Sequence, residues 1–220
     1  MSKSITDYHD PNSLVLKARR KRFDFFLSQL NKLKRPVRLL DVGGTQWFWE
    51  MMDFTDQRNI EISLLNLSHQ EVEHSNFKSL VGDATNMKEF DDNSFDLVFS
   101  NSVIEHLFTW DNQVKMANEI QRVGRNHFIQ TPNYWFPIEP HFVFPLFQYL
   151  PKRIRVGLIS NFSMGHHPKY PDREIAVRKI DEVKLLSIRR MKQLFPNSNI
   201  YLDKFMGFNK SIVAYNFSDP

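Results

Sequence analysis

The chain has 220 residues, a formal net charge of +4, 41% hydrophobic and 14% aromatic residues, and no cysteine. Its size suits one domain with a substantial core, and the lack of cysteine excludes disulfides, thiolate nucleophiles and cysteine-ligated metals. The small positive charge is not the dense basic patch of a dedicated nucleic-acid-binding protein. No apolar run reaches the roughly 18 residues of a membrane-spanning helix, and the polar start lacks a signal-peptide core, so we expect a cytoplasmic protein.

A loose arm is expected over residues 1–12, followed by a helix over residues 13–34 that Pro36 ends. The basic run Arg19–Arg22 is interpreted as a solvated face, with contact to an anionic substrate or membrane as the alternative. Apolar side chains recur on this helix at spacings of three and four and predict one buried stripe, formed by Phe23, Phe26, Leu27, Leu30 and Leu33.

The segment 37–46 carries the first functional signal. Its apolar run ends in Asp41, and Gly43 and Gly44 follow directly. A buried parallel strand has this pattern, and open α/β sheets bind ligands beyond the carboxyl ends of such strands. Glycine lets the backbone turn sharply and approach a ligand closely. We therefore predict a nucleotide-type site here, and an ordinary strand-to-loop turn is the alternative.

Strands alternate with helical segments along the chain, which is typical of a parallel, doubly wound α/β sheet. A final pair of strands with a short connection at 207–210 predicts an antiparallel hairpin. The predicted strands cover 37–42, 61–67, 80–84, 95–100, 126–131, 200–205 and 211–217, and the predicted later helices cover 46–52, 110–123 and 181–195.

Prolines and aromatic residues dominate the segment 132–179. A long irregular segment in a compact domain is typically a lid or a binding loop, and this much aromatic surface argues against disorder. We expect a single domain over residues 1–220, in which the segment 132–179 is inserted as a substrate cap over the carboxyl ends of the strands.

Three motifs in order resemble those of the class I S-adenosylmethionine-dependent methyltransferases, in the branch that acts on small molecules and sugars. They are Leu39–Gly44, Val81–Ala84 and the strand and helix start Phe95–Leu107. The resemblance covers residues 37–131 by motif and 180–217 by architecture. It implies a Rossmann-like, doubly wound, seven-stranded sheet with a C-terminal antiparallel strand, and S-adenosyl-L-methionine as the cofactor.

The resemblance also implies a set of cofactor-binding residues. By it, Asp41 holds the α-amino group and the Gly43–Gly44 backbone passes under the cofactor. Asn66 stands where an acid usually accepts both ribose hydroxyls, and an amide accepts from one of them without the charge. The full set is Asp41, Gly43, Gly44, Thr45, Asn66, Leu67, Asp83, Ala84, Asn101 and Ser102.

The later members of this set have named alternatives. Asp83 is expected to accept from the adenine amino group beside the backbone N–H of Ala84, or else to be a turn residue. Asn101 and Ser102 are expected to flank the sulfonium, or else to cap a helix that starts at Val103. Asp41, in turn, could cap the next helix rather than bind a ligand.

A histidine is the natural general base for an acceptor that must lose a proton, because its pKa lies near neutrality. His106 after the fourth strand and His141 in the aromatic segment are the predicted catalytic residues, with surface or packing roles as the alternative for each. A relative that methylates quinone-type phenols binds a metal with an acid at the position of Ser102, and His166–His167 alone is too little for zinc. The sequence therefore predicts no metal site.

The predicted reaction is methyl transfer to a small-molecule, sugar or lipid-like acceptor in a pocket under the aromatic cap. Ring faces would also attract the sulfonium, whereas the alternative is that these rings are only the core of the inserted segment. The predicted substrate-binding residues are Tyr134, Trp135, Phe136, His141 and His166. The partner is thus a small molecule or a glycan- or lipid-linked substrate, and the sequence does not predict the oligomeric state.

Three other functions are kept as alternatives. An RNA methyltransferase is disfavoured because a proline-proline-aromatic turn is missing after the fourth strand, so nucleic acid is an improbable partner. An NAD-dependent oxidoreductase is disfavoured because the G-x-G-x-x-G spacing is missing. A membrane-surface or protein-binding module would use the apolar-then-basic run Phe142–Arg155, which also leaves peripheral membrane contact open for an enzyme with a lipid-linked acceptor.

Overall fold

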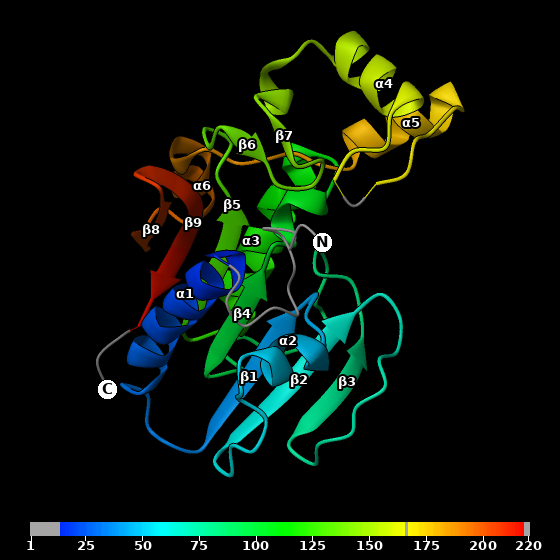
Figure 1. Cartoon of the computed structure of the whole chain (residues 1–220). Helices are drawn as coiled ribbons and strands as arrows, with labels where there is room; N and C mark the ends of the chain where they lie inside the picture. Colours follow the sequence, from blue (N-terminus) through cyan, green and yellow to red (C-terminus); the bar gives the residue numbers. More distant parts are fainter. Residues whose placement is uncertain (1–13, 166, 218–220) are drawn as a thin grey trace. The chain divides into compact units, whose positions relative to one another are not determined.

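The computed structural model describes residues 14–165 and 167–217, so the expected arm over 1–12 and His166 lie outside the described residues (Figure 1). Its helices and strands are, in chain order, α1 Leu14–Leu30, β1 Val37–Val42, α2 Gln46–Met51, β2 Ile60–Asn66, β3 Phe77–Val81, β4 Leu97–Asn101, the 3-10 helix η1 Ile104–His106, α3 Trp110–Val123, β5 His127–Pro132, β6 Ile138–Glu139, β7 Phe144–Pro145, the 3-10 helix η2 Phe147–Tyr149, α4 Lys152–Asn161, α5 Arg173–Asp181, α6 Ile188–Leu194, β8 Asn199–Phe205 and β9 Phe208–Asn216.

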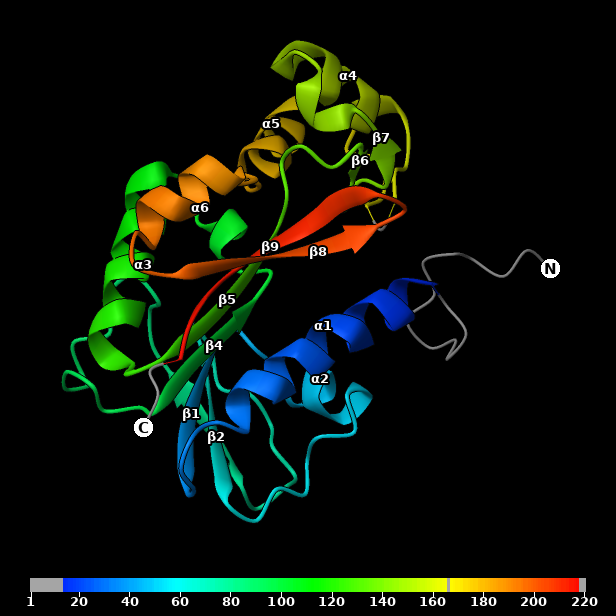
Figure 2. The same ribbon diagram turned by 90° about the vertical axis from the view of Figure 1, so that its left-hand side faces the viewer.

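The described residues form a seven-stranded sheet with the order β3-β2-β1-β4-β5-β9-β8 (Figure 2). β1 pairs in parallel with β2 and with β4, and β2 pairs in parallel with β3. This mixed sheet with a C-terminal antiparallel strand confirms the predicted Rossmann-like fold. Parallel pairing brings the polar residues that follow β1 and β2 to the same edge of the sheet.

The chain divides into two compact units. Among the described residues, the first unit contains 14–100, 119–129 and 215–217, and the second contains 101–118, 130–165 and 167–214. The cofactor motifs before Ser100 lie in the first unit. The predicted histidines and the aromatic segment lie in the second.

Aromatic side chains build the core of the first unit. Phe26 of α1 contacts Phe99 of β4 at 4.9 Å and Phe128 of β5 at 5.1 Å between ring centroids. Trp49 of α2 is fully buried and lies 5.2 Å from Phe99. Phe23, Phe26 and Leu30 are buried, so the predicted stripe of α1 is confirmed at these positions. The core holds α1 and α2 against the strands, and this fixes where β1 ends.

The segment 132–179 has its own secondary structure and its own core. Helices α4 and α5 enclose a cluster of buried residues, which are Phe142, Phe147, Val156, Ile159, Met164, Ala176 and Ile180. The expectation of an irregular segment is therefore wrong, because its apolar residues pack on one another between two helices. Phe142 and Phe147 are core residues of this segment, as the packing alternative predicted.

The helix predicted over 181–195 is confirmed over α6, Ile188–Leu194, but is wrong over 182–187. α5 ends at Asp181 and α6 begins at Ile188, after Ser187, whose hydroxyl accepts a hydrogen bond from the backbone N–H of Arg190. The residues between the helices are held extended by distant partners, since Lys184 N–H donates to the Glu105 carbonyl and Gln113 Nε2 donates to the Lys184 carbonyl. The acids that looked like a first turn belong to the end of α5.

Smaller differences concern element ends. α1 ends at Leu30, after which the N–H groups of Lys32 and Leu33 donate to carbonyls three residues back, in a tighter turn than the α-helix. β3 spans Phe77–Val81 rather than 80–84, and the final strands are joined by Met206–Gly207, whose φ values are 49° and 85°. Positive φ at both positions is what a two-residue hairpin turn of type I′ requires. Arg22 is buried, so the solvated-face interpretation of the basic run fails there.

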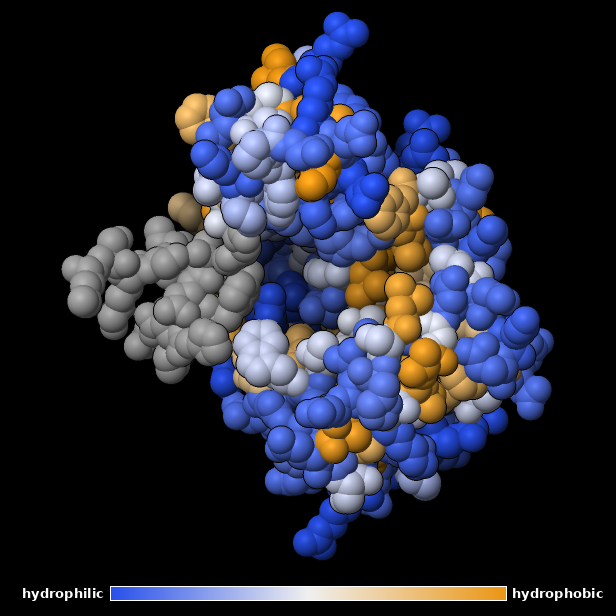
Figure 3. All heavy atoms as spheres, turned by 90° about the vertical axis from the view of Figure 1, so that its right-hand side faces the viewer, coloured by the Kyte–Doolittle hydropathy of each residue, from blue (hydrophilic) through white to orange (hydrophobic). Residues whose placement is uncertain are grey.

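In the part of the chain that the structure describes, no helix is long and apolar enough to cross a membrane. Most of the face drawn in Figure 3 is hydrophilic, and its apolar side chains lie in small groups between polar ones.

Candidate functional site

Asp41 is the last residue but one of β1, in the first unit, and is 1% exposed. Its Oδ2 accepts a hydrogen bond from Trp49 Nε1 at 2.8 Å, and its Oδ1 has no partner among the described residues. Burial raises the pKa of Asp41 to about 7, and the Trp49 bond offsets only part of that rise. A buried acceptor without a partner costs about 1–3 kcal/mol. An ammonium group at Oδ1 would remove this cost, so Asp41 fits the α-amino group of the cofactor.

The loop after β1 is built around Asp41. Gly43 has a φ of 75°, a conformation that glycine adopts without strain. A Cβ at Gly44 would clash with the Asp41 carboxylate, so this position requires glycine. Asn66 at the end of β2 donates from Nδ2 to the Gly44 carbonyl at 2.8 Å, which leaves its Oδ1 as an acceptor. The loop therefore fits the role that the sequence predicts, and Thr45 follows it as the residue before α2.

The predicted ribose and adenine residues are more open. Leu67 after β2 is 82% exposed. Asp83 is exposed, and its Oδ1 accepts from the backbone N–H of Thr85 at 2.8 Å and from its hydroxyl at 2.9 Å. These are the contacts of a turn residue, as the alternative predicted. Adenine contacts from Asp83 and Ala84 stay a prediction.

Ser102 follows β4 in the left-handed region with a φ of 60°. Its N–H donates to the Gln130 carbonyl, and its hydroxyl bonds Gln130 Oε1 at 3.0 Å. The next element is the 3-10 helix η1, whose capping residue is Val103 without a side-chain cap. The prediction that Asn101 or Ser102 caps a helix is therefore wrong.

The structure brings His106 and His141 together in the second unit. Their Nε2 atoms lie 3.2 Å apart. Glu139 Oε1 lies 2.7 Å from His141 Nδ1, and Glu139 Oε2 accepts the backbone N–H groups of His141 and Phe142. The carboxylate is 3% exposed, so it holds the His141 ring from inside the unit. Sequence reasoning missed Glu139, although its place two residues before His141 was a usable signal.

A second buried carboxylate lies beside this pair. Glu105 is fully buried, its Oε2 accepts from the Thr131 hydroxyl at 3.0 Å, and its Oε1 has no partner among the described residues. Burial raises the pKa of Glu105 to about 7. Glu105 lies within the motif Phe95–Leu107, but no role was predicted for it because its burial cannot be read from the sequence.

The surroundings shift the pKa values of the two histidines in opposite directions. His106 is exposed at the surface, yet the atoms packed around its ring, and next the charge of His141, lower its pKa to about 4. Burial acts to lower the pKa of His141 as well, but its hydrogen bond to Glu139 and the charges of Glu139 and Glu105 outweigh it and raise the pKa. His106 is therefore the neutral member of the pair near pH 7.

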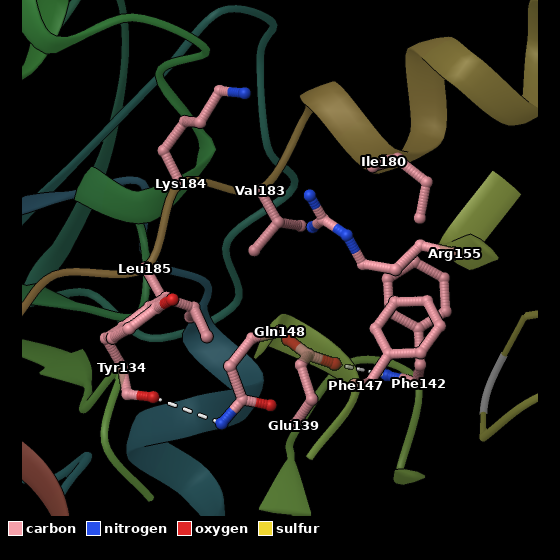
Figure 4. A pocket seen from close by; sticks show the side chains of 10 residues that line it. All are labelled: Tyr134, Glu139, Phe142, Phe147, Gln148, Arg155, Ile180, Val183, Lys184 and Leu185. Atoms are coloured by element: carbon pink, nitrogen blue, oxygen red, sulfur yellow. Dashed lines mark hydrogen bonds between the residues drawn. The ribbon is translucent and has the colours of Figure 1, made fainter. Parts of the chain in front are cut away.

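A pocket of about 250 Å³ opens in the second unit (Figure 4). Gln148 donates from Nε2 to the carbonyls of Tyr134 and Phe136, which fixes the orientation of its amide. Gln148 Oε1 and Arg155 Nε are buried and have no hydrogen-bond partner among the described residues. The lining residues are Tyr134, Glu139, Phe142, Phe147, Gln148, Arg155, Ile180, Val183, Lys184 and Leu185.

The predicted substrate-binding residues divide into three groups. Tyr134 lines the pocket, and His141 lies in the histidine pair next to the pocket residue Glu139. Phe136 is 9% exposed and is a packing residue, and Trp135 is 62% exposed and stacks on Tyr149 at 5.8 Å. His166 lies outside the described residues.

Comparisons with known proteins add to this geometry. Residues 40–127 match the methyltransferase domain family. A stretch of 53 residues is 42% identical to uncharacterized proteins from two strains of Mycobacterium tuberculosis, and it covers 24% of this chain and 18% of each relative. The match therefore spans less than a fifth of the relatives' own length.

Two solved structures share the fold at 10% sequence identity. One is described as a possible exported protein of Bordetella parapertussis, with a TM-score of 0.56 over 97% of this chain and 77% of that chain. The other is the CurJ carbon methyltransferase, with a TM-score of 0.52 over 89% of this chain and 52% of that chain. The seven-stranded fold and the methyltransferase-domain match over residues 40–127 agree with the S-adenosylmethionine-dependent methyltransferases that the sequence motifs resemble.

Proposed function

We propose that this protein transfers a methyl group to a small molecule, or to one sugar of a glycan- or lipid-linked acceptor, bound in the pocket of the second unit. The observation that carries the proposal is a pocket in which aromatic walls surround two buried polar atoms without partners, Gln148 Oε1 and Arg155 Nε. S-adenosylmethionine, when bound, supplies an electrophilic methyl group. Asp41 would hold the amino group of this cofactor. The Gly44 backbone and Asn66 would line the cofactor's binding site at the loop after β1.

The pocket favours a particular kind of acceptor. Gln148 Oε1 accepts a hydrogen bond from a hydroxyl or N–H group, and Arg155 Nε donates to an oxygen. The rings of Tyr134, Phe142 and Phe147 offer flat apolar surface to a sugar or aromatic ring (Figure 4). Pockets for drug-sized ligands measure about 300–1,000 Å³, so about 250 Å³ suits one ring of the acceptor.

A proton acceptor lies next to this pocket within the same unit. Glu139 lines the pocket and also fixes the His141 ring, which in turn contacts His106. His106 and His141 thus stay the proposed catalytic residues, and a carboxylate that orients a histidine is a common arrangement for proton transfer.

The test is S-adenosylhomocysteine production by the full chain with a panel of hydroxylated sugars and phenols. Cofactor at 100 times its dissociation constant should first stabilise the wild type by about 2.7 kcal/mol in thermal unfolding. Gln148→Leu should then raise the KM for the best acceptor about 10-fold or more and leave cofactor affinity unchanged, because it removes the pocket acceptor together with the amide donor that holds the Tyr134 and Phe136 carbonyls. Gln193→Leu, at an exposed position of α6, is the matched control. Equal KM values for both variants would contradict the proposed pocket.

Exposed apolar side chains favour a lipid-linked acceptor as a second candidate. Phe144 and Leu146 beside β7 are 37% and 53% exposed, and Ile154 in α4 is 49% exposed next to the exposed Arg153. Such a surface suits an anionic lipid interface. Phe144→Asp should reduce sedimentation with anionic liposomes, whereas Phe208→Asp, at a 56% exposed site in β9, should not. Equal sedimentation of both variants and the wild type would remove this candidate.

A further inference from the structure

We propose that Glu105, His106 and His141 form a site for one divalent transition-metal ion, for which Zn²⁺ is the best match. Each residue offers one ligand atom, and these atoms all lie within 4.8 Å of one another. Glu105 and His106 come from η1 and His141 from the segment after β6, so two distant parts of the second unit supply the ligands. The ion would be additional to the cofactor and acceptor proposed above.

The spacing of the two imidazoles fits a shared ion. Tetrahedral zinc sites have Zn–N distances of about 2.0–2.1 Å, which places two ligand nitrogens about 3.3 Å apart. The Nε2 atoms of His106 and His141 lie 3.2 Å apart. Their rings are nearly perpendicular, at 88°, so the two nitrogens meet edge to edge without ring stacking.

Glu105 provides the third ligand and the independent sign of a cation. Its Oε1 is buried without a hydrogen-bond partner among the described residues, while its Oε2 is held by the Thr131 hydroxyl. A buried carboxylate oxygen is costly unless it is paired or coordinates a metal. A cation beside His106 and His141 would give this oxygen the partner that it lacks.

The surroundings of the ligands match those of metal sites. A metal-bound histidine usually donates its other ring N–H to a carboxylate, which fixes the tautomer. Glu139 Oε1 lies 2.7 Å from His141 Nδ1, and two backbone N–H groups hold the other oxygen of Glu139. His141 is therefore oriented with Nε2 toward His106. Binding of the ion releases the proton shared by the two Nε2 atoms and turns both lone pairs to the metal.

The donor set selects the ion. Two imidazoles and one carboxylate suit Zn²⁺ or Fe²⁺, whereas Mg²⁺ and Ca²⁺ prefer oxygen ligands only. Three protein ligands leave a fourth position open, as in catalytic zinc sites, and His106 is exposed, so a small ligand can reach it. A hydroxyl bound there loses its proton more easily, and the ion would thus take the role predicted for a lone histidine base.

The sequence predicted no metal for a reason that the structure explains. Ser102 stands where the metal-binding relative has an acid, and the chain contains no cysteine. His141 lies 35 positions after His106, a separation that matches no local ligand motif. Only folding brings His141 to Glu105 and His106.

The experiment uses tag-free, chelator-treated full chain in isothermal titration calorimetry with ZnCl₂ and, separately, with MgCl₂. We expect one Zn²⁺ per chain, no saturable Mg²⁺ binding, and at least 100-fold weaker Zn²⁺ binding by the His106→Ala/His141→Ala double variant. Glu139→Gln should weaken binding about 10-fold to 100-fold, because it disturbs the residue that orients His141 and removes none of the three ligands. Co²⁺ should give visible absorption bands with the wild type that the double variant lacks.

His69→Ala, which removes an exposed histidine of the first unit, is the matched control and should bind Zn²⁺ like the wild type. Equal urea midpoints of all variants in chelator, and equal affinity for S-adenosylmethionine, would show that the fold and the cofactor site are intact. Wild type without saturable Zn²⁺ binding, or a double variant that binds as tightly as the wild type, would overturn the site. Neither result depends on methyl transfer, so failure here is distinct from failure of the proposed function.

Discussion

The two units place their functional residues in different ways. In the first unit, Asp41 and Gly44 lie three positions apart on one strand-to-helix loop, and Asn66 joins them from the neighbouring strand. In the second unit, His106 and His141 are 35 positions apart and contact each other directly, while a buried carboxylate, Glu139, holds the His141 ring. A site built on one loop leaves a local sequence pattern, whereas a site built by tertiary contacts leaves almost none.

The largest expected effect tests whether the close contact between Gly44 and Asp41 is needed for cofactor binding in the first unit. Gly44→Ala places a Cβ against the Asp41 carboxylate, which Trp49 and its burial hold in place. We expect at least a 100-fold loss of S-adenosylmethionine affinity, about 2.7 kcal/mol, measured by calorimetry. Gly157→Ala in α4 is the matched control, since nothing lies within 4 Å of an added Cβ there. Similar affinities of the two variants would mean that the loop accommodates the added Cβ and that glycine at position 44 is not required for cofactor binding.

The degree to which the sequence predicted each region follows from the range of the contacts involved. The helix over 110–123 was predicted at both ends because its apolar residues repeat with helical period, and the β1–Asp41–Gly44 loop because a buried strand ends there. The segment 182–187 was misread because Glu105 and Gln113, far along the chain, hold it extended. Glu139 was missed because burial, and not its residue type, makes it the partner of His141.

The second prediction concerns the pH dependence that Asp41 gives to the first unit. Its folded pKa of about 7 lies above the unfolded value of 3.8, so the folded state holds the proton more tightly. The resulting stabilisation is complete below pH 4 and is lost as pH rises through 7. Relative to Asp41→Asn, the wild type should therefore lose about 2 kcal/mol of unfolding free energy between pH 5 and pH 8.

Urea unfolding at each pH measures this difference, and the two proteins differ in one buried acid alone. Because Asn keeps an acceptor for Trp49, the comparison isolates the ionisation of Asp41. A difference between the two proteins that stays constant from pH 5 to pH 8 would show that Asp41 ionises normally and that its Oδ1 is solvated.

The third prediction tests how the second unit positions its histidine. Gly165 has a φ of 57°, and a Cβ there would lie 2.7 Å from the backbone carbon of Phe142 and 2.9 Å from the His141 carbonyl oxygen. Gly165→Ala should therefore reduce the unfolding free energy by about 2 kcal/mol, from backbone strain and displacement of this loop. Gly207 also has a positive φ, 85°, but nothing lies within 4 Å of an added Cβ there. Gly207→Ala should therefore reduce the unfolding free energy by only about 1 kcal/mol. Equal costs would mean that close approach to His141 contributes nothing.

The smallest expected effect distinguishes the two interpretations of residues 181–195 by its sign. In the structure, the Ser187 hydroxyl accepts from the Arg190 N–H at 3.3 Å at the start of α6, so Ser187→Ala should destabilise the protein by about 1 kcal/mol. In one continuous helix, the same change would stabilise by about 0.5 kcal/mol, because alanine is the better helix former. Ser160→Ala, inside α4, is the control and should show that stabilising sign. Urea unfolding of both variants measures the signs, and a Ser187→Ala protein more stable than the wild type would restore the continuous helix and detach Lys184 from Glu105.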